Sequence, residues 1–287
     1  MNIINIKILF LFLIESIFEN LPISSTFYII LISNLINIDY NYVKDILNLI
    51  NFSIFLSIYL KFKEKLNFIL FLKLLITLLP ILIFNIYIYK YLKFIINNLI
   101  YLLIIFIIFS IIIIFNKLII NNIYSYNNNI KNEISIKDSL LIGIFTCLSF
   151  IPGVSRLGST ILGGLLCLVN YNIIIDYSYM LNIIIKLLIL LKTIYEYLII
   201  NDYNINFNIK SIIYNKYILF IIISNILSFI VSKITINYFY NYLKESKENF
   251  INFGYYRILL VTIIFIIYYI INNNNNNYNS INRFYFF

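Results

Sequence analysis

The fold is decided by one polar, glycine-containing stretch that lies between apolar runs: Ile151-Pro152-Gly153-Val154-Ser155-Arg156-Leu157-Gly158-Ser159-Thr160. The chain around it has 287 residues, of which 62% are apolar and 11% charged, and its mean hydropathy is +0.93. A water-soluble domain needs more polar residues than this to cover its surface. Runs such as 102–115 contain no charged residue and are typical of membrane spans. We therefore expect a polytopic membrane protein.

Glycine, proline and arginine are rare in this chain and gather in two segments. Five of the six glycines lie between positions 143 and 164, together with Pro152 and Arg156. The other segment, residues 13–26, reads Leu-Ile-Glu-Ser-Ile-Phe-Glu-Asn-Leu-Pro-Ile-Ser-Ser-Thr. Because proline disfavours helix at the preceding residue, each segment predicts two half-helices that meet at a non-helical turn. Such backbone occurs at membrane depth only where it lines a cavity or is buried in protein.

Three apolar spans follow each of these broken segments, near residues 46–60, 66–88, 94–116, 177–200, 216–238 and 255–272. If both broken segments are re-entrant, they enter the membrane from opposite faces, and the two halves form an inverted repeat with a site where the turns meet. The expected fold is an all-α polytopic membrane protein with about six transmembrane helices and two re-entrant helix pairs. The alternative is that both segments are ordinary spans kinked by proline.

The remaining composition bears on domains and partners. We expect residues 1–272 to form a single integral membrane domain, and residues 273–287 to be a low-complexity, asparagine-rich tail. The formal net charge is +9, but the lysines lie mostly between apolar runs, where positive charge anchors loops. No nucleic-acid partner is therefore expected.

Two glutamates in the first segment predict a site that holds a cation. Glu15 and Glu19 are four residues apart and share one face of a helix. Two bare carboxylates at membrane depth repel each other, so they need a proton, a divalent metal ion or Arg156 from the other segment. Charged side chains inside a membrane are costly and indicate function. The alternative is an interfacial helix whose carboxylates reach water.

The second segment predicts an anion site, most simply for phosphate. A guanidinium at Arg156 stands beside the hydroxyls of Ser155 and Thr160, and amides at a helix N-terminus add positive potential. Gly153 and Gly158 let the backbone approach a ligand closely. The other interpretation, a face of small residues for helix packing, does not account for Arg156.

The motif Glu15-x-x-x-Glu19, followed by Leu21-Pro22-Ile23-Ser24-Ser25-Thr26, together with residues 151–160, resembles the two signature motifs of the undecaprenyl-diphosphate phosphatase family of the bacitracin-resistance type. Segments 74–80, 138–143 and 253–260 resemble that family as well. The resemblance implies a multi-pass enzyme of the bacterial inner membrane. It removes the terminal phosphate of undecaprenyl diphosphate and so recycles the lipid carrier for peptidoglycan synthesis. Its implied partners are an isoprenoid lipid diphosphate and the lipid bilayer; a homodimer stays open.

The resemblance also implies roles for single residues. Ser25 is the implied nucleophile or phosphate contact, and Glu15 and Glu19 are the acid/base or cation-binding pair. Arg156 acts with the hydroxyls of the second motif as a phosphate clamp. The further implied substrate contacts are Ser24, Thr26, Tyr28, Gly153, Ser155, Gly158 and Thr160. The family implies dependence on a divalent cation, Mg²⁺ or Ca²⁺, for which Glu15 and Glu19 are the expected ligands.

Three positions depart from the family pattern. Tyr28 stands where the family has histidine, Leu157 where it has serine, and Ile184 where it has proline. A phenol is a poor base at neutral pH. We expect activity to be retained or reduced, with Glu19 acting as a base or through the metal. The other hypotheses are a flippase or transporter of the lipid phosphate and a catalytically impaired relative kept as a membrane scaffold.

Overall fold

The computed structural model describes residues 3–40, 47–96, 98–126, 130–202 and 218–275, and this part of the chain is helical, without a β-strand. The α-helices are α1 (Ile3–Phe18), α2 (Ser25–Leu35), α4 (Asn51–Phe62), α5 (Phe68–Ile96), α6 (Leu99–Tyr126), α7 (Ile136–Cys147), α8 (Arg156–Leu166), α9 (Tyr171–Asp202), α11 (Ile218–Glu245) and α12 (Lys247–Asn275). Short 3-10 helices occupy η1 (Asn48–Ile50), η2 (Lys63–Lys65) and η3 (Leu148–Phe150). Residues 276–287 of the expected tail lie outside the described residues.

The two broken segments have the same local construction. In the first, α1 ends at Phe18 and α2 begins at Ser25, and the Ser24 side chain caps α2 by accepting a hydrogen bond from the Phe27 amide. In the second, α7 and η3 are followed by a turn, and Ser155 caps α8 by accepting from the Gly158 amide at 3.1 Å. Serine is a preferred residue at this position because its oxygen satisfies an amide that has no partner within the helix.

The two turns touch each other. The amide of Gly153 donates a hydrogen bond to Ser24 Oγ at 3.1 Å, across 129 positions of sequence. Gly153 has φ +102°, a conformation that other residues rarely adopt, and a Cβ here would lie 3.2 Å from Ile105 Cγ2. Glycine is therefore required at this turn both by the backbone conformation and by the close approach of α6.

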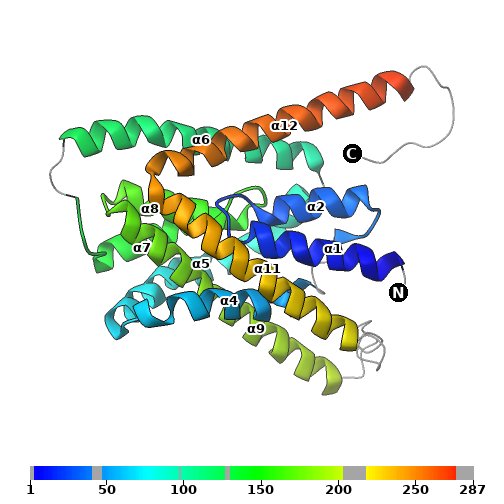
Figure 1. Ribbon diagram of the computed structural model, residues 1–287, viewed down its shortest axis with the longest axis horizontal. Helices are drawn as coiled ribbons and strands as arrows, with labels where there is room; N and C mark the ends of the chain where they lie inside the picture. Colours follow the sequence, from blue (N-terminus) through cyan, green and yellow to red (C-terminus); the bar gives the residue numbers. More distant parts are fainter. Residues whose placement is uncertain (1–2, 41–46, 97, 127–129, 203–217, 276–287) are drawn as a thin grey trace.

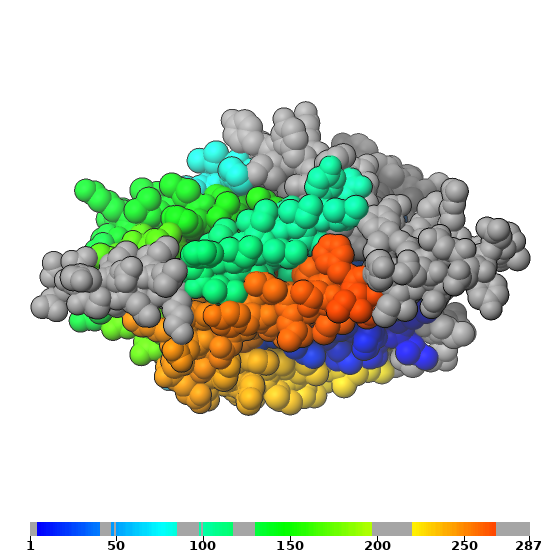
Figure 2. Space-filling model, turned by 90° about the horizontal axis from the view of Figure 1, so that it is seen from above, coloured from blue at the N-terminus to red at the C-terminus, as the bar shows by residue number. Residues whose placement is uncertain are grey.

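The long helices pack around these turns in pairs. Helix α5 packs on α7, α8 on α9, and α4 on both α9 and α11, while α1 contacts α2 and α11 (Figure 1). Along one edge of the molecule α6 and α12 lie side by side, and they form a continuous surface in the view from above (Figure 2). The two turns are thereby enclosed by helices from both halves of the chain.

The outer surface is suited to lipid. Within the described residues, three helical stretches are long and apolar enough to cross a membrane, Tyr171–Glu196, Phe220–Glu245 and Lys247–Ile267. On α6 and α12 large apolar side chains are exposed, among them Ile108, Phe115, Leu259 and Ile266. Monomeric soluble proteins rarely expose apolar patches of this extent. The part of the chain that the structure describes is all-helical, and the chain is a membrane protein, as the composition predicts.

Candidate active site

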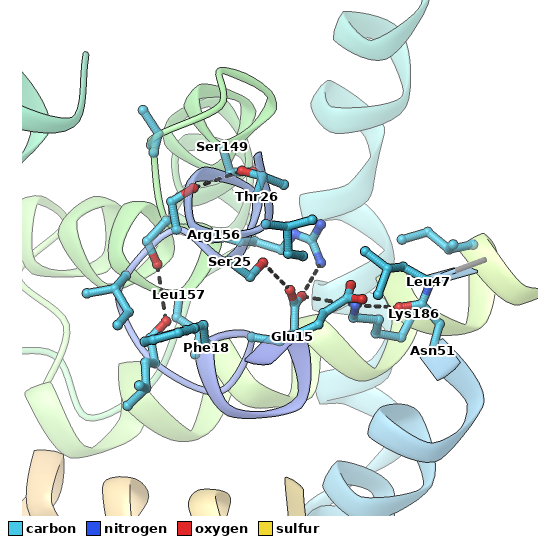
Figure 3. Close-up of a pocket in the computed structure, with 18 of the residues that line it drawn as sticks. Glu15, Phe18, Ser25, Thr26, Leu47, Asn51, Ser149, Arg156, Leu157 and Lys186 are labelled. Atoms are coloured by element: carbon cyan, nitrogen blue, oxygen red, sulfur yellow. Dashed lines mark hydrogen bonds and ion pairs between the residues drawn. The ribbon is translucent and has the colours of Figure 1, made fainter. Parts of the chain in front are cut away.

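A cavity of about 200 Å³ lies where the two turns meet, walled by α1, α2, α8 and α9. A volume of this size holds several water molecules, at about 30 Å³ each, or a phosphate group. The polar residues that line the cavity are Glu15, Glu19, Ser24, Ser25, Thr26, Tyr40, Asn48, Asn51, Ser149, Ser155, Arg156 and Lys186. Seven of these are site residues predicted from the sequence. In Figure 3 the side chains of Ser25, Arg156 and Lys186 converge on the region beside Glu15.

Glu19 is the point on which the site converges. Ser25 Oγ donates a hydrogen bond to Glu19 Oε2 at 2.8 Å. Arg156 Nη1 and Lys186 Nζ each lie 3.2 Å from the other carboxylate oxygen, Oε1. One carboxylate thus accepts from a serine and from two cations that come from different helices. A hydroxyl paired with a carboxylate in this way is the arrangement of an activated nucleophile and its base.

Glu15 lies one helical turn before Glu19 and is also buried. Its Oε2 atom has no hydrogen-bond partner among the residues that the structure describes. A buried carboxylate oxygen without a partner is unfavourable unless an ion or a ligand group meets it. Glu15 therefore offers the cavity an acceptor that the protein itself leaves unsatisfied.

Arg156 is the first residue of α8 and is partly exposed to the cavity, with 29% of its side chain accessible. Besides contacting Glu19, its Nη1 donates to Asn182 Oδ1 of α9 at 3.0 Å. Among the described residues the donors on Nε and Nη2 have no partner. A guanidinium held at one end with donors to spare is suited to binding phosphate oxygens.

Lys186 in α9 is a site residue that the motif analysis missed. Its side chain is 3% exposed, and Nζ donates to Asn51 Oδ1 of α4 at 2.6 Å in addition to contacting Glu19. It is the only charged residue between Asp176 and Lys192 in the sequence. That isolation was the available signal, because a charge inside an apolar run is costly and marks a functional position.

The other predicted residues shape the turns. Ser155 Oγ donates to the Leu21 carbonyl at 3.4 Å, and Thr160 Oγ1 donates to the Arg156 carbonyl at 2.8 Å. Gly153, Gly158 and Thr160 do not line the cavity. Their contacts hold the two turns together and fix the start of α8, so they position Arg156 from outside the cavity.

Tyr28 also lies apart from the cavity. Its ring stacks on Phe18 with 3.9 Å between centroids and meets Phe106 edge-on at 6.2 Å. The side chain is 4% exposed and belongs to the apolar core between α1, α2 and α6. The Tyr28 ring therefore packs α2 against α1 and α6.

Arg257 of α12 supports the second turn from behind and was not among the predicted site residues. It is fully buried, and its Nη2 donates to the carbonyls of Gly153, at 2.5 Å, and Phe106, at 3.2 Å. Nε donates to Ser110 Oγ at 3.0 Å, and the guanidinium lies 3.8 Å over the Phe106 ring. As for Lys186, the position of Arg257 inside an apolar segment was the signal in the sequence that could have identified it.

The fit of the site to a divalent cation depends on Glu15. The described residues contain no cluster of three or more histidine, cysteine, aspartate or glutamate side chains. A closed protein cage for a metal is therefore not formed by them. Mg²⁺ is commonly held by one or two carboxylates together with substrate phosphates, however, and the unsatisfied oxygen of Glu15 fits that mode.

Comparison with known proteins identifies the family. The family model described as bacitracin resistance protein BacA matches residues 8–263, a range that includes both turns and all walls of the cavity. The chain belongs to this family. Among relatives in the BacA family, the undecaprenyl-diphosphatase of Methanococcus aeolicus is 33% identical over 259 residues, covering 88% of this chain and 94% of that protein.

Two further relatives carry the same name. The undecaprenyl-diphosphatase of Campylobacter jejuni is 31% identical over 259 residues, with 89% of this chain and 91% of the relative covered. That of Enterococcus faecalis is 30% identical over 272 residues, with 88% and 94% covered. The family resemblance predicted from the two motifs is confirmed.

Proposed function

We propose that this protein hydrolyses undecaprenyl diphosphate to undecaprenyl phosphate and inorganic phosphate. The observation that carries the proposal is the convergence of Ser25, Glu19 and Arg156 in one cavity of a BacA-family chain. The relatives named undecaprenyl-diphosphatase support the substrate. The reaction regenerates the lipid carrier of peptidoglycan synthesis, and this recycling accounts for bacitracin resistance.

In the proposed reaction Ser25 is the nucleophile and Glu19 the base. Ser25 Oγ attacks the terminal phosphorus while Glu19, hydrogen-bonded to it at 2.8 Å, takes its proton. The bond from that phosphorus to the bridging oxygen breaks, and undecaprenyl phosphate leaves. Water then attacks the phosphoserine, which releases inorganic phosphate and restores the serine hydroxyl. Arg156 neutralises charge on the phosphoryl oxygens, which is the main requirement of phosphoryl transfer.

Glu15 is the proposed protein ligand for a divalent cation, Mg²⁺ or Ca²⁺, shared with the substrate. When bound, such an ion supplies Lewis-acid polarisation of the phosphoryl oxygens. Glu19 is the less suitable ligand because both of its oxygens already accept bonds from the protein. Glu15 is thus the proposed cation ligand, and Glu19 is the proposed base.

A second, apolar cavity supports a lipid substrate. It measures about 480 Å³ and is lined by residues of α1, α11 and α12, including Tyr238, Phe253 and Tyr256. Phe18, Leu21 and Ile23 line both this cavity and the polar one. In the proposed complex the diphosphate lies among the charged groups and the first isoprene units lie against the apolar wall. Apolar pockets with a few placed polar groups are typical ligand sites.

The proposed membrane arrangement has six crossing helices, α4, α5, α6, α9, α11 and α12, and two re-entrant pairs, α1–α2 and α7–α8, in one domain of the inner membrane. The common construction of the two pairs supports an inverted repeat, because three helices, α4, α5 and α6, separate them. Contact between the two turns supports a site within the bilayer.

The inverted repeat also favours a second candidate, a flippase that moves the lipid without cleaving it. Proteoliposomes that contain undecaprenyl diphosphate and Mg²⁺ separate the two functions. We expect inorganic phosphate release by the wild-type protein and by Lys192→Ala, whose side chain is exposed on α9, and loss of release in Arg156→Ala. Lipid movement across the bilayer without phosphate release would contradict the hydrolase and support the flippase.

A further inference from the structure

Lys186 is a buried cation in the cavity wall that neither motif contains. Its ammonium group lies on α9, lines the polar cavity, and contacts Glu19 and Asn51. Burying a lysine among apolar residues is costly, because the ammonium loses its hydration. Favourable interactions of the Lys186 ammonium group must therefore offset this cost.

An ion pair with Glu19 alone does not explain why a lysine is buried at position 186. Glu19 already has Arg156 on the same oxygen at the same distance of 3.2 Å, so the second cation adds to a carboxylate that is already paired. The extra positive charge is matched by Glu15, whose Oε2 atom has no hydrogen-bond partner among the described residues. The cavity thus holds two cations close together beside two carboxylates.

The ammonium has a donor to spare. Lysine carries three N–H donors. Two are used, one toward Glu19 Oε1 and one toward Asn51 Oδ1, and the third has no partner in the described part of the chain. In Figure 3 Lys186 approaches the carboxylates from the side of Asn51, whereas Arg156 approaches from the side of Ser25.

The spacing of the two cations fits a diphosphate. Arg156 Nη1 and Lys186 Nζ both lie 3.2 Å from one oxygen atom, so they are separated by no more than twice that distance. Oxygens on one phosphoryl group, or on the two phosphoryl groups of a diphosphate, can span such a gap. The guanidinium suits two oxygens at once, and the ammonium acts as a point charge.

We propose that Lys186 is a second cationic contact of the diphosphate and acts together with Arg156, which lies beside it in the cavity. The proposal rests on the proposed function for the identity of the ligand. Arg156 comes from the second motif and Lys186 from the helix after it, so the diphosphate is held between α8 and α9.

The test measures binding separately from hydrolysis. The probe is methylenediphosphonate, a diphosphate analogue that is not hydrolysed, titrated into the purified full-length protein by calorimetry. We expect Lys186→Met to weaken its binding about 10-fold or more, because it removes a hydrogen bond between two charged groups. Lys186→Arg keeps the positive charge and should lose less affinity than Lys186→Met. The control Lys192→Met removes an exposed lysine of the same helix and should change nothing.

Melting temperatures of all variants are recorded in parallel, and Lys186→Gln replaces Lys186→Met if that variant does not fold. Equal affinity of the wild type and the uncharged variant for methylenediphosphonate would overturn the proposal, even if the hydrolysis rate fell. Absence of binding by the wild type would overturn it too. If the wild type binds the probe through Lys186 but releases no phosphate from undecaprenyl diphosphate, the contact stands and the proposed hydrolysis fails.

Discussion

At the scale of single residues, the two oxygens of Glu19 divide the site into two functions. Oε2 accepts from the Ser25 hydroxyl, which is the arrangement for removing its proton. Oε1 faces Arg156 and Lys186, the cations available to phosphoryl oxygens. The Glu19 carboxylate therefore links the proposed nucleophile to the two cations that can neutralise phosphate charge. Its surroundings are formed by α1, α2, α8 and α9.

Replacing Ser25 by alanine removes the proposed nucleophile while leaving the cations in place. We expect phosphate release from undecaprenyl diphosphate to fall by about 100-fold or more, with little change in melting temperature. Ser24→Ala is the matched control: its hydroxyl caps α2 and accepts from the Gly153 amide, so we expect a loss of stability of about 1 kcal/mol and a smaller effect on rate. Hydrolysis by Ser25→Ala at the wild-type rate would contradict the role of Ser25.

Sequence reasoning found the residues that belong to the two motifs and missed those that the fold adds. Glu19, Ser25 and Arg156 could be predicted because rare residues gather around them. Asn51 and Asn182 could not, because an asparagine is common in this chain and acquires meaning only through its partner. Asn51 meets Lys186 across 135 positions, and only the packing of α4 on α9 brings them together.

At the scale of elements, the start of α7 is stabilised by a capping box. Ser135 Oγ accepts from the Asp138 amide at 3.2 Å, while Asp138 Oδ2 accepts from the Ser135 amide at 2.9 Å. Lys131 Nζ lies 2.7 Å from Asp138 Oδ1. Burial alone would raise the pKa of Asp138, but the hydrogen bonds from Lys131 and Ser135 outweigh it and hold this pKa below its usual value.

Asp138→Asn keeps an acceptor oxygen but removes the charge. Because the pKa of Asp138 is lowered by folding, its stabilisation is fully present above the unfolded pKa, near 3.8, and is lost as the pH falls through the lower folded value. We expect the variant to melt at a lower temperature than the wild type at neutral pH, by the equivalent of about 1 kcal/mol. Melting curves should converge below about pH 4. A difference that grows as the pH falls would contradict this assignment.

The contact between α8 and α9 depends on Gly164. A Cβ at this position would overlap the side chain of Ile174. We expect Gly164→Ala to destabilise the protein by about 1–3 kcal/mol through overpacking. The double variant Gly164→Ala/Ile174→Ala makes room again and should recover part of the loss, as measured by melting temperature. If Ile174→Ala lowers the melting temperature as much in the Gly164→Ala protein as in the wild type, a side chain at position 164 and Ile174 do not compete for space.

At the scale of the whole molecule, composition predicts the membrane class and the two broken segments, but it does not predict which helices pack together. In helices such as α5, α6 and α12 the apolar residues are not gathered on one face, so no face of them is marked for burial. The pairing of α6 with α12 emerges from contacts such as Gly254, where a Cβ would lie 2.8 Å from Ile114 Cγ1. Packing by close approach of small residues leaves little trace in a single sequence.

The proposed hydrolysis by Ser25 and Glu19 is tested most directly by phosphate release from undecaprenyl diphosphate, measured with purified full-length wild type and with Glu19→Gln. Glutamine keeps the shape of the side chain and an acceptor for Ser25, but it is a far weaker base and carries no charge. We expect turnover by the wild type, a loss of about 100-fold or more in Glu19→Gln, and wild-type rates in the control Glu196→Gln, whose side chain is exposed on α9. Equal rates for Glu19→Gln and the wild type would contradict the role of Glu19 as the base.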